Sequence, residues 1–372
     1  MKVFVPLVLA LAMLASRPLP ARACGAFFVS STDQNVALGA QRALYVLHDS
    51  TIDLHIQPHA APAGTPFVWI VPVPSQPTLA LGSSALFDAL DTLTQPTVTI
   101  TSGGGGGGGG FCGSADKAGG GLGGDHGIDH FGGGQLGDYT YDIIAGASAQ
   151  ALSTWLTDNG YAVPATFADV VAPYADKVLF VAIKLTDPGQ ADIDLQPLVV
   201  SFARPFESSL GYAAGMSKLS TADVAPILVW VLADKRYRIA NFGSAELSEI
   251  AGAMREQVDA GQEASYAAAL KTLTDESEGR LAITEYAKDL THAGSVPSEI
   301  AAVMDADAHY LTRLYMEVPR DALQDLVITF AANAPEVDPF ASADAGSRTP
   351  ATATCIVLAI AFVARRRRAS ER

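Results

Sequence analysis

Four potential metal ligands lie close together near the middle of the chain, namely Asp125, His126, Asp129 and His130. Carboxylate oxygens and imidazole nitrogens bind divalent cations, and a flexible segment can fold around such an ion. The same residues are equally typical of a solvated polar tip on a loop. The sequence therefore offers a divalent-metal site here as a hypothesis, and it predicts no other cofactor.

No other cluster forms a catalytic motif. The patterns G-x-S-x-G, H-E-x-x-H and Walker A are all missing from the sequence. His55 and His59 have a helical ligand spacing, but Pro58 and the alternating pattern around them indicate a strand and a turn. Their side chains would then point apart. We therefore expect ordinary surface histidines and assign no catalytic residue.

The N-terminal residues have the pattern of a secretory signal peptide. Lys2 precedes an apolar run of 13 residues from Val3 to Ala15, which is too short to span a membrane. Ala21, Arg22 and Ala23 then form a small-x-small cleavage site. Residues 1–23 are thus predicted to be removed after Ala23, and the protein is predicted to use the export machinery.

The C-terminal residues 355–372 combine a short hydrophobic segment with a basic end. Cys355 precedes an uncharged run that is followed by Arg365, Arg366, Arg367 and Arg368. One interpretation is a short membrane anchor that keeps its arginines on the cytoplasmic side. The order of cysteine, apolar run and arginines also resembles the MYXO-CTERM tails of myxobacterial surface proteins. That resemblance implies sorting machinery that processes the tail at Cys355.

Two cysteines, Cys24 and Cys112, lie in the part predicted to be exported. In an oxidising compartment two such cysteines usually pair, which predicts a disulfide between them; two free thiols are the alternative.

The body of the protein is strongly acidic. Without the three basic residues of 1–23, and without the six basic and one acidic residues of 345–372, it holds 15 basic and 38 acidic residues, a net charge of −23. Such a surface repels phosphate backbones, so nucleic-acid binding is excluded.

Hydrophobic periodicity predicts an α+β fold with an antiparallel or mixed sheet and grouped helices. Residues 42–57 alternate as a hairpin with one wet face, in which Leu44 and Val46 precede the turn at His48–Ser50 and Ile52, Leu54 and Ile56 follow it. Further strands are predicted at 67–73, 97–101, 139–144, 178–185, 195–202, 227–232, 311–318 and 326–330. Helices are predicted after Ser83, at 151–159, at 164–175 and, with interruptions, from 247 to 290, where Ile283, Tyr286 and Leu290 keep helical spacing.

A glycine-rich segment interrupts this pattern. Residues 103–137 contain 19 of the 34 glycines. Ordering polyglycine costs much backbone entropy, so we predict a flexible insert over 102–137, which would be a long hairpin loop between its flanking strands. The predicted organisation is a single domain over 24–340, a linker over 341–354 and the tail.

Five sequence blocks resemble the domain of unknown function 2330 family of secreted bacterial proteins. They are Ala23–Phe28, Phe67–Pro74, Ala85–Leu90, Trp155–Tyr161 and Leu311–Tyr315. The resemblance implies fold and location and supplies no site residues. The sequence thus favours an exported cell-envelope or surface protein, held at the membrane by its C-terminal segment, that acts as a non-enzymatic binding or structural module. A secreted hydrolase with scattered site residues and a metal-binding protein are the alternatives.

Overall fold

The computed structural model describes residues 26–29, 41–57, 66–100, 128–185, 196–204, 209–219 and 222–343. The predicted signal peptide, all three cysteines and the arginine tail lie outside these ranges and stay predictions. In the described part, no helix is long and apolar enough to cross a membrane.

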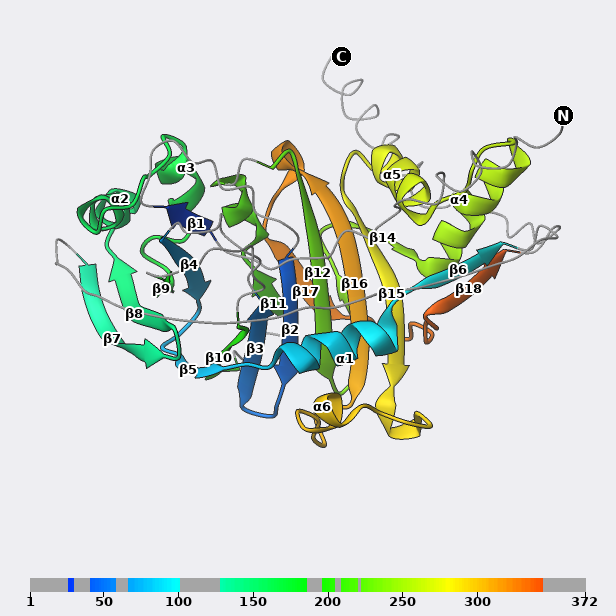
Figure 1. The fold of residues 1–372 in the computed structure, drawn as a ribbon, viewed down its shortest axis with the longest axis horizontal. Coiled ribbons are helices and arrows are strands. Elements are labelled where there is room, and N and C mark those ends of the chain that lie inside the picture. Colours follow the sequence, from blue (N-terminus) through cyan, green and yellow to red (C-terminus); the bar gives the residue numbers. More distant parts are fainter. Residues whose placement is uncertain are drawn as a thin grey trace, which may run out of the picture.

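Two sheets form the centre of the molecule (Figure 1). The first is antiparallel and has the order β1 (Ala26–Val29), β4 (Phe67–Val73), β9 (Leu179–Leu185), β8 (Tyr139–Gly146), β7 (Ile128–Leu136). The second is mixed and has the order β14 (Gly243–Glu246), β15 (Leu281–Asp289), β16 (Tyr310–Pro319), β12 (Val224–Ala233), β2 (Gln41–Leu47), β3 (Thr51–Gln57), β10 (Leu198–Ala203), β5 (Thr78–Leu81). Its two parallel pairs are β12–β2 and β14–β15. The predicted α+β class with antiparallel and mixed sheets is confirmed.

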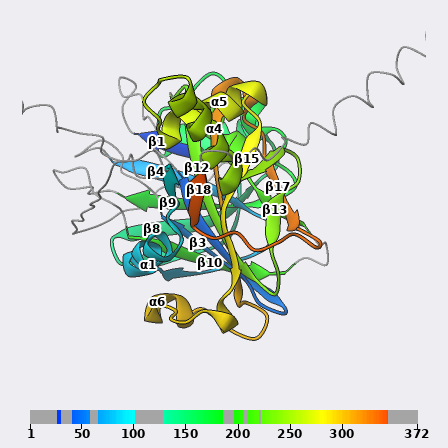
Figure 2. The same cartoon turned by 90° about the vertical axis from the view of Figure 1, so that its right-hand side faces the viewer.

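Smaller sheets and helices complete the fold. One small sheet joins β11 (Ser209–Tyr212), β17 (Leu326–Phe330) and β13 (Tyr237–Ile239), and another pairs β6 (Thr97–Ile100) with β18 (Phe340–Ala343). The helices are α1 (Ser84–Thr94), α2 (Ala149–Asp158), α3 (Phe167–Val171), α4 (Leu247–Asp259), α5 (Tyr266–Glu276) and α6 (Ser298–Ala301), with short 3-10 turns η1 (Ala214–Leu219), η2 (Leu290–His292) and η3 (Arg320–Ala322). Figure 2 shows α4 and α5 at one end of the molecule and α6 at the other.

The core consists of layers: one lies between the two large sheets, and others lie between each sheet and the helices on its outer face. The facing sides of the two sheets share one apolar cluster, which includes Trp69 and Val229. Helices α2 and α3 cover the outer face of the five-stranded sheet with Trp155 and Phe167. Helices α1 and α6 cover the outer face of the eight-stranded sheet with side chains such as Phe87. Burial of these apolar side chains is the main stabilising contribution to such a fold.

The hairpin of β2 and β3 corrects the expectation of one wet face. Its register pairs Leu44 with His55 and Val46 with Asp53, so these residues share the face covered by α1. Ile52 and Leu54 lie on the opposite face, in the core between the sheets. Side chains alternate between the two faces within each strand as predicted, but the length of the turn sets which residues of the two strands lie opposite each other.

Strand β15 corrects the helix predicted to continue to residue 290. A β-bulge lies between Thr284 and Tyr286, so Glu285 is an extra residue in the ladder. The bulge shifts the two-residue period by one, and Ile283 and Tyr286 therefore share a sheet face although they are three residues apart. Such spacing imitates one face of a helix.

The glycine-rich region and its flanks also differ from the prediction. Residues 128–136, expected within the flexible insert, form the edge strand β7, while 101–127 lie outside the described residues. Strand β6 pairs with β18 and not with β8, so the insert does not connect a hairpin. Strand β18 extends the fold to Ala343, inside the predicted linker. Pairing partners so distant in sequence leave no local signal.

Gly146 offers a test of how tightly α2 packs on the five-stranded sheet. A Cβ atom at this position would lie 2.5 Å from Cγ of Leu152, which is buried. We expect Gly146→Ala to lower the free energy of unfolding by about 1–3 kcal/mol, because a close-packed interface cannot absorb the added methyl group. Urea denaturation measures this. Gly252→Ala in α4 is the control, since a Cβ there meets nothing within 4 Å and is expected to be neutral or stabilising. Equal midpoints for wild type and Gly146→Ala would contradict the packing.

Candidate functional site

The predicted metal ligands are only partly within the described structure. Asp125 and His126 lie outside it, whereas Asp129 and His130 are exposed, successive residues of β7. Successive side chains of a strand point to opposite faces, so these two do not converge on one ion. Among the described residues, no three histidine, cysteine or acidic side chains are grouped to hold a metal. The four-residue metal site stays a prediction, since Asp125 and His126 lie outside the described residues.

His55 differs from its expected surface position, while His59 lies outside the described ranges. The side chain of His55 is buried on β3, with 7% of the residue exposed. Its Nδ1 atom has no hydrogen-bond partner among the described residues. Burial outweighs the nearby charge of Asp53 and lowers the pKa of His55 to about 4.

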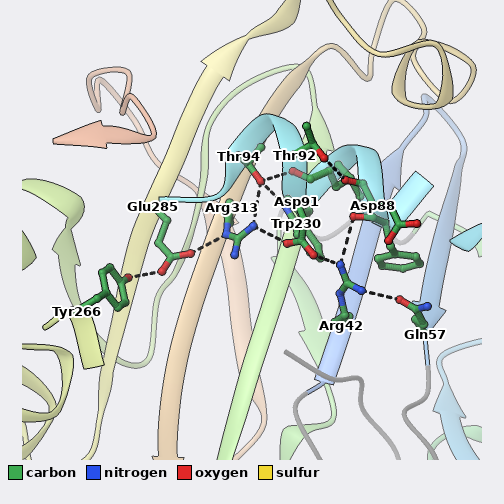
Figure 3. Close-up of polar contacts among 12 residues, drawn as sticks. Arg42, Gln57, Asp88, Asp91, Thr92, Thr94, Trp230, Tyr266, Glu285 and Arg313 are labelled. Atoms are coloured by element: carbon green, nitrogen blue, oxygen red, sulfur yellow. Dashed lines mark hydrogen bonds and ion pairs between the residues drawn. The ribbon is translucent and has the colours of Figure 1, made fainter. Parts of the chain in front are cut away.

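The most extensive buried polar cluster lies beneath α1 (Figure 3). Arg313 Nε donates to Glu285 Oε2 at 2.6 Å, and Arg313 Nη1 donates to Asp91 Oδ1 at 2.8 Å. The hydroxyl of Tyr266 donates to the other oxygen of Glu285. Only 2% of Glu285 and 7% of Arg313 are exposed, so these charges interact with little solvent screening. We call these four residues, together with Arg42, the α1 ion network.

Arg42 extends the α1 ion network toward β3. Its guanidinium pairs with the second oxygen of Asp91 and donates to Gln57 Oε1 at 3.0 Å. The guanidinium carbons of Arg42 and Arg313 lie 5.7 and 5.2 Å from the centre of the Trp230 ring. Both guanidinium groups therefore make cation–π contacts with the same indole ring, and both also pair with the carboxylate of Asp91. The network therefore contains two positive and two negative groups.

Five secondary-structure elements position the side chains of the α1 ion network: β2, α1, α5, β15 and β16. The bulge in β15 turns Glu285 toward Arg313 on the neighbouring strand β16. Asp91 comes from α1, whose apolar residues Phe87 and Leu90 fix the helix on the sheet. Thr94, at the end of the same helix, accepts from Trp230 Nε1 at 3.0 Å and from Arg313 at 3.2 Å. Helix α5 delivers Tyr266.

The electrostatics of the network fix the protonation states of Arg313 and Tyr266. Burial alone would lower the pKa of Arg313, but the charges of Glu285 and Asp91 outweigh it and raise that pKa. Burial and the adjacent Glu285 raise the pKa of Tyr266 well above its ordinary value. Arg313 is therefore always protonated and Tyr266 always neutral near pH 7. Neither group is poised to exchange a proton with a substrate.

A second buried cation lies under α2. Lys184 on β9 donates to Asp142 Oδ2 at 2.8 Å, and its ammonium lies 4.9 Å from the centre of the Trp155 ring. Asn159 Oδ1 accepts from the same ammonium at 3.4 Å. Burial and Asp142 raise the pKa of Tyr161 to about 12. The charge of Lys184 is thus compensated by a carboxylate, as that of Arg313 is. Through Trp155 and Asn159, Lys184 also connects α2 to the five-stranded sheet.

A wide groove of about 1080 Å³ runs between α3, η1 and η3. Its polar lining includes four aspartates and two basic side chains: Asp169, Asp223, Asp321, Asp325, Lys218 and Arg320. Asp325 Oδ1 accepts from the hydroxyl of Tyr174 and, at 3.0 Å, from the amide of Gly215. A Cβ at position 215 would lie 2.8 Å from that oxygen, so glycine is what allows this close approach. Asp325 thus ties the walls of the groove together.

A family model decides the affiliation of the chain. The model of the family described as "Uncharacterized protein conserved in bacteria (DUF2330)" matches residues 18–329 of the 372 residues. The chain belongs to the DUF2330 family. This confirms the resemblance drawn from the five sequence blocks. No curated protein and no solved structure matches the chain.

Two of the DUF2330 blocks supply parts of the buried polar clusters. The block Leu311–Tyr315 contains Arg313, and the block Trp155–Tyr161 contains Trp155 and Asn159, which contact Lys184. Sequence analysis missed both cations as candidate residues. The available signal was a charged residue inside a largely apolar strand: Lys184 is the single one in β9, whereas Arg313 shares β16 with Glu317. Such a residue must find a buried partner, because an uncompensated charge in a core is very costly.

Proposed function

We propose that this DUF2330 protein is an exported cell-envelope or surface protein that acts as a non-enzymatic binding or structural module. Export machinery would recognise residues 1–23, and C-terminal sorting machinery would act at Cys355. The C-terminal segment would hold the protein at the membrane before or without processing. The acidic body is suited to an extracytoplasmic location and unsuited to nucleic acid.

The observation that carries the non-enzymatic part is the internal compensation of the α1 ion network. A catalytic acid or base needs a pKa near the working pH and access to a substrate. Glu285 is 2% exposed and pairs with Arg313, while Tyr266 keeps its proton. Every charged side chain of the network has an oppositely charged partner within the protein. These features support a role in holding α1 and α5 on the sheet.

Intact-mass analysis of the envelope fraction tests export and processing together. We expect the mature protein to begin at Cys24 and to lack Arg365–Arg368. Ala23→Leu should block cleavage, because signal peptidase needs a small residue at that position. Arg22→Lys is the matched control, since the middle position of the small-x-small site is tolerant.

Two results would count against this proposal. Unprocessed protein that begins at Met1 in the cytoplasm would refute export. Surface-exposed protein that retains all four C-terminal arginines would refute processing of the tail and leave the permanent-anchor interpretation.

A further inference from the structure

A contact between the tip of the β2–β3 hairpin and the segment after α6 joins two parts of the chain at one end of the molecule (Figure 1). His48 in the hairpin turn contacts Asp305 through Nδ1 and Asp53 through Nε2, the latter at 3.4 Å. Asp305 also accepts from the backbone amides of Asp307 and Ala308, each at 2.8 Å. The carboxylate therefore orders its own turn and binds the hairpin tip at the same time.

The two contacts of His48 specify a protonation state. A neutral imidazole has one N–H donor and one acceptor nitrogen, whereas an imidazolium has two donors. Ionised Asp53 and Asp305 can only accept. Both ring nitrogens of His48 are satisfied by these carboxylates only when the ring carries both protons.

We propose that His48, Asp53 and Asp305 form a clasp that holds segment 302–308 against the hairpin while His48 is protonated and releases it when His48 loses a proton. A deprotonated ring would leave one carboxylate facing a nitrogen lone pair. Release would affect the covering of the α1 face, because Ile300, just before this segment, and Ala308, its last residue, are fully buried against that core.

The surrounding charges set the direction of the switch. Burial lowers the pKa of His48, but Asp305 and Asp53 outweigh it and raise that pKa above 6.5. The clasp is therefore complete below pH 6.5 and is lost as the pH rises through the raised value. His55, the other histidine near Asp53, is neutral under these conditions. Arg204 donates to the backbone oxygen of His48 at 2.7 Å and holds the hairpin tip in both states.

The lower pH limit of the clasp depends on the ionisation of Asp305. Hydrogen bonds from His48 and from its own turn lower the pKa of Asp305, despite the opposing effect of burial. The carboxylate thus stays ionised until the pH falls well below neutrality. The clasp is closed between these limits, so segment 302–308 is expected to respond to a rise in pH above 6.5.

Hydrogen exchange read by mass spectrometry on the full mature protein tests the clasp. The measurement compares about pH 6 with about pH 9, after correction for the intrinsic exchange rate. Peptides covering 302–308 should exchange several-fold faster at the higher pH, while peptides from β12 and β16 stay protected. His48→Gln and Asp305→Asn should exchange fast at both pH values. His292→Gln, which replaces an exposed histidine, should behave like wild type.

A second measurement is independent of any variant. The NMR titration midpoint of His48 in the wild type should coincide with the pH at which segment 302–308 loses protection. Equal protection of the wild type at both pH values, or midpoints that differ, would overturn the proposal. It would also fall if His48→Gln kept the wild-type protection and its pH dependence.

Discussion

Replacing Arg313 by Met should lower the free energy of unfolding by about 3–5 kcal/mol, because it leaves Glu285 as an uncompensated buried charge. Glu285 is 2% exposed and has no other cationic partner among the described residues. Asp91 contributes less to this cost, since its side chain is 37% exposed and keeps its pairing with Arg42. Chemical denaturation at neutral pH measures the loss.

A neutralising second substitution distinguishes charge from packing. In Arg313→Met with Glu285→Gln, the glutamine carries no charge and can still accept from Tyr266, so the double variant should recover more than half of the lost stability. Lys271→Ala is the control, because it removes an ion pair with Asp275 whose side chains are 72% and 64% exposed. That change should alter stability by at most about 0.5 kcal/mol. If Arg313→Met were as mild as Lys271→Ala, the network would not be the internal support that we infer.

Acid should destabilise the protein through His55. In the folded state burial keeps this ring neutral down to about pH 4, whereas in the unfolded chain it binds a proton near pH 6.5. The unfolded state therefore takes up more protons as the pH falls through this window, and stability declines. We expect a contribution of about 2 kcal/mol by about pH 5 and about 3 kcal/mol by about pH 4. Urea denaturation at a series of pH values measures it.

The variant His55→Leu isolates this contribution. Leucine fits an apolar strand position between Leu44 and Val199 and does not titrate. The difference in stability between the variant and the wild type should grow in favour of the variant as the pH falls below 6.5. His292→Gln should leave the wild-type slope unchanged. A pH profile of His55→Leu parallel to the wild type would mean that His55 does not carry the effect. The clasp at His48 does not interfere, because its transition lies above pH 6.5.

Much of the secondary structure was predictable from local patterns. The apolar run of β4, the alternating strands β2 and β3 and the periodic faces of α1 and α2 all lie where the sequence placed them. Ser83 occupies the N-cap of α1 as expected, although its side chain makes no capping hydrogen bond. These elements succeed because their periodicity reflects which side is buried, and that information lies within a few neighbouring residues.

The α1 ion network was not predictable in the same way. Its members are spread over more than two hundred positions of the sequence and follow no regular spacing: Arg42, Asp91, Tyr266, Glu285 and Arg313. Their meeting depends on strand order, since β16 separates β15 from β12, and on a bulge that redirects Glu285. The bulge also gives the apolar residues of β15 a spacing that resembles one face of a helix. The lone charge in the apolar strand β9 marked Lys184 as unusual, but no local pattern identified the partners of Lys184 or of Arg313.

The α+β class, the family and most individual elements could be predicted from the sequence, because burial leaves its period in the order of neighbouring side chains. The three-dimensional arrangement established which strands pair, which face of the β2–β3 hairpin meets α1, and that β6 lies beside β18. It also decided that His55 is buried and that His48 reaches Asp305, which is 257 residues away. Contacts of this kind arise from strand order and register, and the free energy that selects them comes from the core as a whole.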